Sequence, residues 1–301
     1  MTRARASPAP APTEPAAPRA WTYVVAKLRA LDASIVEVGP RVLAAKDGTL
    51  DEEAVHDLRV AIRRMRTLLK LSRRLFGRWH TDVVRRAFAE VMRATGELRD
   101  EEVLEETVKG ASTAPELAGW TRDRKRREAR LRRALVAQLE RGDLDRARLL
   151  LKALLVFPVE PSRDAELARF ARRVVERARR RVESMRDVET SNVIGLHDLR
   201  IAYKELRYAI ELLADALPID ARAQLEPATV FQKRLGEIHD ADVAIEVIGR
   251  ARLPVATRDE VLVRLRAVRE RRVAKYLREL DPLGTPVPPR AEIEVDPARK
   301  S

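Results

Sequence analysis

The sequence contains no cysteine, and this absence removes several kinds of chemistry at once. Without thiols the chain forms no disulfides or thiolate metal sites and has no cysteine nucleophile, which is compatible with a reducing compartment. Apolar runs are short, since none approaches the roughly 20 residues that span a bilayer. Residues 1–18 also lack the leucine-rich core of a signal peptide. We therefore expect a soluble, cytoplasmic protein with no membrane partner.

Residues that favour strands and tight turns are scarce. Aromatic residues make up 4% of the chain and only 11 of its 301 residues are glycine, whereas Ala, Leu, Arg and Glu dominate. Such a composition favours helices over strands. Hydrophobic residues amount to 45%, enough to supply a core. We predict an all-α protein.

Catalytic and cofactor-binding motifs are missing as well. The sequence has no glycine-rich loop that would cradle a phosphate, and no nucleophile stands beside a base in a recognised motif. We therefore predict that the protein is not an enzyme and needs no cofactor.

Positive charge is what the sequence has in excess. There are 60 Lys and Arg residues against 47 Asp and Glu, a net charge of +13. This imbalance predicts an anionic partner, for which nucleic acid, membrane headgroups and polyphosphate are the candidates.

Proline-rich segments lie at both ends of a long helical region and also divide it near its midpoint. Residues 1–19 form a Pro/Ala tail that we expect to be disordered, and residues 281–301 form a second tail. The apolar spacing predicts helices throughout residues 20–280. Prolines near the midpoint separate a first helical repeat, 20–157, from a second, 158–280.

Glycine and proline also predict interruptions within helices. Pro40 predicts a kink or break in the first helix. Gly96 should end a helix, with Asp100 capping a short one after it. Gly236 and Asp240 predict the same interruption in the second half.

An eleven-residue pattern occurs twice, at residues 56–66 and 141 positions later at residues 197–207. Six of the eleven positions are identical, because both copies begin His-Asp-Leu-Arg, share an alanine and end in arginine. A Gly-x-x-x-Asp element recurs in the same order, at residues 96–100 and 236–240. We therefore predict a tandem duplication that forms two pseudo-symmetric helical bundles.

The cationic residues of each copy form a stripe along one side of a helix. At about 100° per residue they fall within an arc of roughly 80°, and the apolar residues occupy the opposite arc. Adjacent like charges repel one another, so some partner should offset them. Carboxylates on neighbouring helices would do so, but recurrence of the stripe with its histidine favours a functional role. The stripe residues are His56, Arg59, Arg63 and Arg66 in the first copy, which Lys70 extends, and His197, Arg200, Lys204 and Arg207 in the second.

A phosphate polymer is the anion that best suits such stripes. Guanidinium forks match phosphate oxygens, and a row of cations matches regularly spaced negative charges. Single-stranded nucleic acid also fits, but its binders normally interleave aromatic residues for base stacking. The motif helices hold only Tyr203 and Tyr208, without counterparts in the first copy. A phosphate chain without bases is the simpler ligand, and a nucleic-acid-associated basic helical protein is the alternative.

The histidines do not form a recognisable metal-ligand pattern. His56 and His197 each precede an aspartate that points about 100° away on a helix, and no histidine pair at metal-ligand spacing accompanies them. We predict no metal site. His80 has no repeat partner and is interpreted as a surface residue, whereas His239 stands where the first copy has Arg99 and could contact phosphate.

Two further basic stretches lie at residues 121–133 and 172–181. Such runs are usually solvated helix faces. Some of their residues could still line a channel shared with the stripes. The candidates are Lys125 and Arg130 in the first stretch, and Arg173, Arg177 and Arg180 in the second.

The doubled motifs resemble the CHAD family, the conserved histidine α-helical domain. The shared pattern is His-x-x-Arg-x-x-x-Arg-x-x-Arg at residues 56–66, its second copy, and the two Gly-x-x-x-Asp elements, and the resemblance covers about residues 20–280. The resemblance implies two pseudo-symmetric helical bundles around a basic central pore that binds inorganic polyphosphate. It also implies that bacterial members associate with polyphosphate granules. It nominates the eight stripe residues, with Lys233 as a further candidate. Members often accompany a triphosphate-cleaving CYTH domain, which this sequence does not show, so the resemblance also implies binding without catalysis.

Overall fold

The structure is a computed structural model that describes residues 17–44, 51–156 and 164–280. In these ranges the chain is built of α-helices, as its composition predicts, with one isolated β-bridge between Arg19 and Glu166. No helix in the described ranges is long and apolar enough to cross a membrane. The helices are α1 (Ala20–Leu43), α2 (Glu52–Leu71), α3 (Arg73–Phe76), α4 (Arg78–Ala111), α5 (Leu117–Glu140), α6 (Asp143–Val156), α7 (Leu167–Glu183), α8 (Val193–Leu213), the 3-10 helix η1 (Ala214–Ala216), α9 (Ile219–Ala223), α10 (Leu225–Gly249) and α11 (Val255–Leu280).

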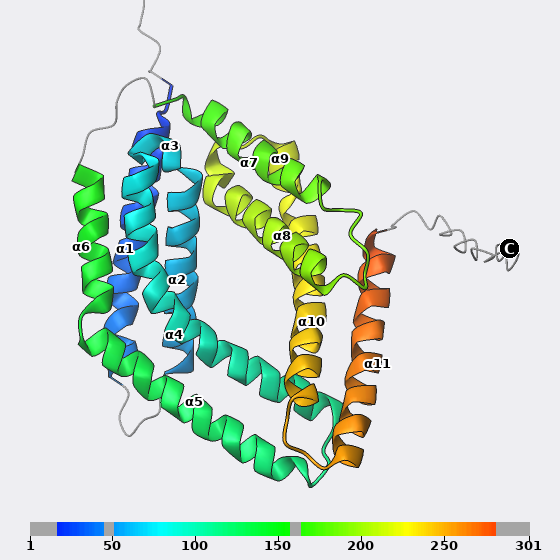
Figure 1. The fold of residues 1–301 in the computed structure, drawn as a ribbon. Helices are drawn as coiled ribbons and strands as arrows, with labels where there is room; N and C mark the ends of the chain where they lie inside the picture. The colour runs from blue at the N-terminus through cyan, green and yellow to red at the C-terminus, as the bar shows by residue number, and fades with distance from the viewer. Residues whose placement is uncertain (1–16, 45–50, 157–163, 281–301) are drawn as a thin grey trace, which may run out of the picture.

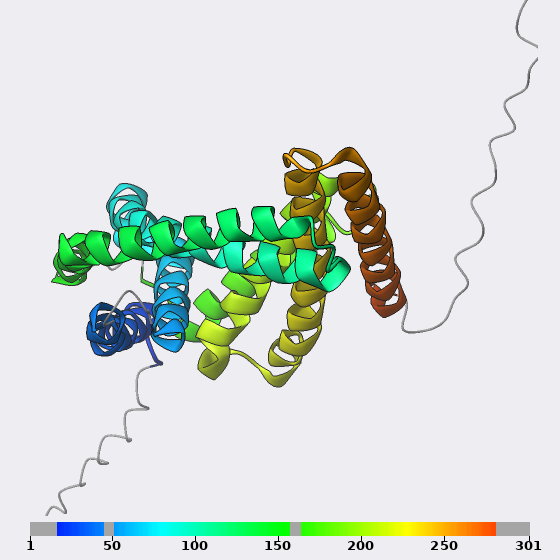
Figure 2. The same cartoon turned by 90° about the horizontal axis from the view of Figure 1, so that it is seen from below.

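The helices pack in two consecutive series. In the first, α1 packs on α2, α2 on α4, and α4 on both α5 and α6; in the second, α7 packs on α8, α8 on α10 and α10 on α11. The two series meet where α2 contacts α8, α4 contacts α10 and α1 contacts α7. In Figure 1, α1, α2 and α6 lie on one side of the molecule and α10 and α11 on the other, with α4 and α5 running between them. The view from below shows α5 lying alongside α4 (Figure 2).

The two motif helices, α2 and α8, are held in place by their apolar faces and by capping residues. The predicted apolar face of α2, which includes Leu58, Ile62 and Met65, is fully buried in the main core. Burying each of these large side chains stabilises the fold by roughly 1.5–3 kcal/mol. The side chain of Asp51 accepts a hydrogen bond from the Ala54 amide at 2.9 Å and so caps the N-terminus of α2. The cationic residues of the motif consequently lie away from the core.

The interruptions predicted at the two Gly-x-x-x-Asp elements are wrong. Helix α4 runs without a break through Gly96 and Asp100, and α10 runs through Gly236 and Asp240. A glycine within a helix costs only about 1 kcal/mol relative to alanine. Burial of apolar side chains on both sides of each glycine, such as Val91 and Leu98 in α4, outweighs that cost.

The predictions for Pro40 and for the tails also need correction. Helix α1 continues past Pro40 to Leu43, so the proline does not break the helix; only one turn follows it, and the Ala44 amide donates to the Pro40 carbonyl. The tails predicted at residues 1–19 and 281–301 lie outside the described residues, except for residues 17–19. Those three belong to the folded unit, since the Pro18 carbonyl accepts a 2.8 Å hydrogen bond from the Leu167 amide and Arg19 binds Asp164.

Candidate functional site

The helices that carry the two copies of the motif contact each other directly. Arg63 on α2 donates a 3.3 Å hydrogen bond to the Tyr208 hydroxyl on α8. Two ion pairs also join the helices, Arg64 to Glu211 at 3.8 Å and Lys70 to Glu205 at 2.5 Å. The structure therefore brings both predicted stripes to one place, although the copies are 141 residues apart in the sequence.

Lys204 on α8 lies at the centre of a cluster of cations. Its burial is the main reason that its pKa falls from the ordinary 10.5 to about 8, and four guanidinium groups lower the pKa further. In order of effect these groups belong to Arg63, Arg200, Arg59 and Arg66, so α2 contributes three of them and α8 one. We call Lys204 and these four arginines the cation cluster. Bringing five positive charges together disfavours the empty site and favours a multivalent anion.

Acidic residues act on the cation cluster only from beyond ion-pairing distance, Asp100 and Glu102 on Arg59 and Asp240 and Asp100 on Arg200. None of its five members is within ion-pairing distance of a described Asp or Glu. Six buried side-chain nitrogen and oxygen atoms of the described residues lack a hydrogen-bond partner, and three of them belong to stripe residues: Nε of Arg66, Nε of Arg200 and Nδ1 of His197. Each such atom costs the fold roughly 1–3 kcal/mol. An anion with several oxygens would give these groups the acceptors that the protein does not.

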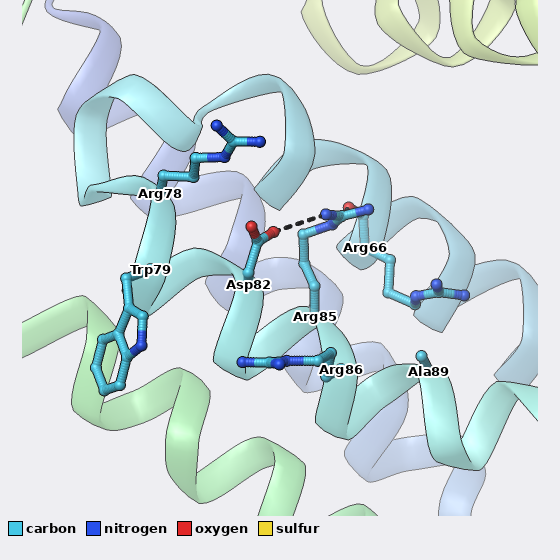
Figure 3. A pocket seen from close by; sticks show the side chains of 7 residues that line it. All are labelled: Arg66, Arg78, Trp79, Asp82, Arg85, Arg86 and Ala89. Atoms are coloured by element: carbon cyan, nitrogen blue, oxygen red, sulfur yellow. Dashed lines mark hydrogen bonds and ion pairs between the residues drawn. The ribbon is translucent and has the colours of Figure 1, made fainter.

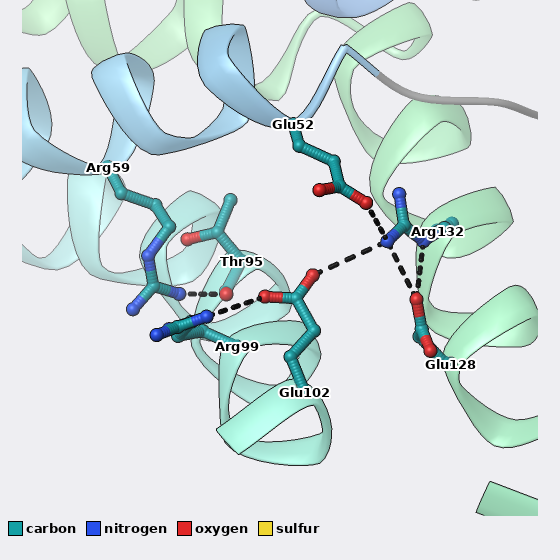
Figure 4. A network of polar contacts seen from close by, with 7 residues as sticks. All are labelled: Glu52, Arg59, Thr95, Arg99, Glu102, Glu128 and Arg132. Atoms are coloured by element: carbon teal, nitrogen blue, oxygen red, sulfur yellow. Dashed lines mark hydrogen bonds and ion pairs between the residues drawn. The ribbon is translucent and has the colours of Figure 1, made fainter. Parts of the chain in front are cut away.

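Arg59 is held at the junction of α2 and α4 (Figure 4). Its guanidinium donates a hydrogen bond to the backbone carbonyl of Thr95. Burial lowers the pKa of Arg59 to about 10, and Arg63 has the next largest effect. The neighbouring Glu102 is already bound by Arg99 at 3.2 Å and by Arg132 at 3.4 Å. Glu102 is therefore engaged elsewhere, and Asp100, which has the larger effect on the pKa of Arg59, acts from beyond ion-pairing distance.

Arg132 connects α5 to this junction. It binds Glu128 at 2.6 Å and Glu52 at 3.1 Å, as well as Glu102. The sequence placed this arginine in a run interpreted as a solvated face, and nothing in the local pattern signals its role. Only the packing of α5 against α4 reveals it. His56, at the start of α2, is exposed and lines a hollow of about 290 Å³ that it shares with Arg59 and Arg132.

On the side of α8, a pair of histidines adjoins the cation cluster. The rings of His197 and His239 lie 4.6 Å apart between centroids, so His239 of α10 lies beside the second stripe, and its contact with phosphate stays a prediction. Burial, followed by the charge of Arg200, lowers the pKa of His239. Gly236 on α10 faces Arg200, and a Cβ there would lie 3.5 Å from its Nε. That is an ordinary van der Waals distance, so an alanine would also fit beside the guanidinium.

Two stripe residues have carboxylate partners. Lys70, predicted to extend the first stripe, instead binds Glu205, which Arg181 of α7 also binds at 2.9 Å. Arg207 binds Glu211 at 2.7 Å. Of these pairs, Lys70–Glu205 joins α2 to α8, Arg181–Glu205 joins α7 to α8, and Arg207–Glu211 lies within α8. The motif does not signal these roles of the glutamates and of Arg181.

The remaining candidates lie apart from the cation cluster. Arg130, Arg177 and Lys233 are exposed, and Arg180 pairs with Glu176 at 2.9 Å. Lys125 and Arg173 are exposed too. No contact joins any of these side chains to α2 or α8 within the described ranges, so their part in binding stays a prediction. The described residues also hold no group of three or more His, Asp and Glu arranged to bind a metal ion.

The fold and site together define an all-helical protein in which two basic helices from opposite halves of the chain create a cluster of cations that form no ion pair with a described residue. A family model described as the CHAD domain matches residues 24–249. The chain therefore belongs to the CHAD domain family, as its motifs predicted.

Two solved structures share this fold. One is the crystal structure of the CHAD domain from the plant Ricinus communis, which is 20% identical with a TM-score of 0.61, over 87% of this chain and 88% of the plant chain. The other is PptA from Streptomyces chartreusis, which is 16% identical with a TM-score of 0.68, over 88% of this chain and all of PptA. No curated protein matches the sequence. At these identities the likeness establishes the fold alone.

Proposed function

We propose that this protein binds inorganic polyphosphate without catalysing a reaction, and that the phosphate chain lies along the stripes of α2 and α8. One observation carries the proposal: Lys204 and four arginines from two distant copies of a motif converge without an ion-pair partner in the described residues. Polyphosphate supplies many closely spaced anionic oxygens, which guanidinium groups bind in pairs. The binding residues we propose are the eight stripe residues, together with His239.

The length of the stripe favours a polymer over a single phosphate. From His56 to Arg66 a helix rises about 15 Å, since each residue adds about 1.5 Å. One orthophosphate cannot contact both ends of such a row. A chain of phosphates can, and it would also reach the second stripe through the cation cluster.

Nucleic acid fits this site less well. Single-stranded nucleic acid is usually bound through exposed aromatic rings on which the bases stack. Both aromatic residues of the motif helices, Tyr203 and Tyr208, are buried in the core. The stripes therefore offer charge without a stacking platform.

The proposal includes the predicted duplication, with repeats at residues 20–157 and 158–280 and a basic pore between them. Support comes from the two ion pairs that join α2 to α8, Arg64 with Glu211 and Lys70 with Glu205. Adding 141 to residues 64 and 70 gives 205 and 211, so each pair maps onto the other when the halves are exchanged. A twofold axis between α2 and α8 produces this exchange. In such a pore neither motif copy binds the chain fully alone.

The family resemblance extends the proposal to the cell. We expect the protein to be cytoplasmic and to associate with polyphosphate granules where these form. A fluorescent fusion should then colocalise with stained granules, and a variant that has lost polyphosphate binding should be diffuse.

A double charge reversal tests the site. Arg59→Glu with Arg200→Glu should abolish binding of labelled long-chain polyphosphate, while circular dichroism remains helical. Arg146→Glu with Arg169→Glu is the matched control, because each half again loses one arginine but both side chains are exposed and belong to neither motif helix. Retained affinity in the first variant would refute the site. Displacement of polyphosphate by DNA at equal phosphate concentration would favour the nucleic-acid alternative.

A further inference from the structure

A separate pocket of about 500 Å³ opens between the end of α2 and the first turns of α4 (Figure 3). Residues 78, 79, 82, 85 and 86 recur at helical spacing, so one face of α4 forms most of its wall. Arg66 of α2 forms the opposite end. Pockets of this size accommodate small organic ligands. The polyphosphate stripes do not account for it, apart from Arg66.

Three arginines of the pocket are free to bind an anion. Asp82 binds Arg85 at 2.9 Å and also binds Arg73, and Arg85 donates a 3.2 Å hydrogen bond to the backbone carbonyl of Arg66. Asp82 therefore orders one side of the pocket. The guanidinium groups of Arg66, Arg78 and Arg86 form no ion pair with any described residue.

The N-terminus of α4 adds to this positive potential. This helix has 34 residues, begins at Arg78, and has neither an acidic residue in its first turn nor a capping side chain. Its first backbone amides thus remain available as donors, and the helix dipole favours an anion there.

An aromatic ring stands at the far end of the pocket from Arg66. The side chain of Trp79 is 69% exposed, which is unusual for so large an apolar group. Its ring meets that of His80 in an edge-to-face arrangement, at 5.0 Å between centroids. Figure 3 shows Arg86 extending toward Trp79 while Arg66 lies across the pocket. A flat apolar surface and a set of guanidinium groups thus line one cavity.

We propose that this pocket binds a nucleoside triphosphate, with its base stacked on Trp79 and its phosphates held by Arg86, Arg78 and Arg66. Stacking on an exposed indole and pairing with guanidinium groups are the two interactions that such a ligand requires. A phosphate chain without a base would leave Trp79 unused.

Because Arg66 belongs to both sites, a ligand in the pocket should regulate polyphosphate binding; this step rests on the proposed function. The same guanidinium belongs to the cation cluster around Lys204 and lines the pocket. A nucleotide that engages Arg66 removes one cation from the polyphosphate stripe. Nucleotide and polyphosphate should therefore weaken each other's binding by the same factor.

Calorimetric titration of the full chain with ATP and with inorganic tripolyphosphate tests the pocket. Trp79→Ala should weaken ATP binding about tenfold and leave tripolyphosphate binding unchanged, because only ATP has a base to stack. Arg86→Ala should weaken both ligands. Trp120→Ala, which removes a half-buried tryptophan of α5, is the control and should change neither affinity. Equal ATP affinity in Trp79→Ala and the wild type, or no ATP binding at all, would overturn the inference.

A second variant separates this inference from the proposed function. Lys204→Met should weaken long-chain polyphosphate binding and leave ATP binding intact, since Lys204 does not line the pocket. Binding of ATP without any binding of polyphosphate would refute the proposed function alone. Binding of polyphosphate without ATP would refute the pocket alone.

Discussion

Replacing Lys204 by methionine should stabilise the free protein while weakening its binding of polyphosphate. The pKa of Lys204 falls from 10.5 to about 8 on folding, and at about 1.4 kcal/mol per pKa unit the fold disfavours the charged side chain by about 3 kcal/mol. Methionine has a similar shape and no charge, so it removes this penalty. We expect the free energy of unfolding at pH 7 to rise by about 1–3 kcal/mol.

The advantage of the methionine variant should depend on pH in a defined direction. The folded protein loses the Lys204 proton as pH rises through about 8, whereas the unfolded chain keeps it up to about 10.5. The penalty on the wild type is thus complete below pH 8 and disappears by pH 10.5. Urea unfolding at a series of pH values measures it, with the exposed Lys152→Met on α6 as a control that should change stability by less than about 0.5 kcal/mol.

Binding supplies the complementary measurement. A bound phosphate chain should raise the pKa of Lys204, so the wild type should take up a proton on binding near pH 9. Calorimetry in buffers of different ionisation enthalpy detects that proton, and the methionine variant should not show it. A destabilised variant, or one that binds polyphosphate as tightly as the wild type, would show that a partner within the protein already satisfies Lys204.

Three further predictions concern charge and packing around the motif helices. If each of the five cations in the cluster contacts one phosphate, the logarithm of polyphosphate affinity should fall with the logarithm of salt concentration at a slope of about −3.5. This value takes roughly −0.7 per phosphate from single-stranded nucleic acid, and a slope near zero would contradict the prediction. Glu205→Gln should lower the free energy of unfolding in urea by about 1–2 kcal/mol, because this 17% exposed side chain binds both Lys70 and Arg181. The control Glu246→Gln, at a 59% exposed side chain, should lower it by less than about 0.5 kcal/mol, and equal losses would contradict the role of Glu205. Gly195→Ala should cost about 1–3 kcal/mol, since its Cβ would lie 2.2 Å from the Val188 Cγ2 atom. Gly110→Ala, also in a helix but with no atom within 4 Å, should instead gain up to about 1 kcal/mol, and unchanged stability of the first variant would refute the packing argument.

The helical fold followed from the sequence because its determinants are local. Helix-forming composition and apolar spacing predicted the class, and the buried face of α2 appeared where the periodicity placed it. The breaks at Gly96 and Gly236 were predicted wrongly because a glycine is a local signal. Long-range burial on α4 and α10 decides whether the helix continues.

The site was only partly predictable for the same reason. Repetition of the motif identified the stripe residues, and their convergence depends on how α2 packs against α8. The sequence could not show that Lys70 is neutralised by Glu205. Nor could it show that Arg66 of α2 would lie across a pocket from Trp79 of α4. Such neighbours are set by tertiary packing and leave no local pattern.

A crystal structure of the protein with a short polyphosphate tests the central proposal most directly. The account predicts a phosphate chain between α2 and α8, with oxygens bound to Lys204, Arg63 and Arg200 and with the Arg200 and Arg66 Nε atoms paired. A chain bound only to the exposed arginines of α5 and α7, with the cation cluster untouched, would contradict it.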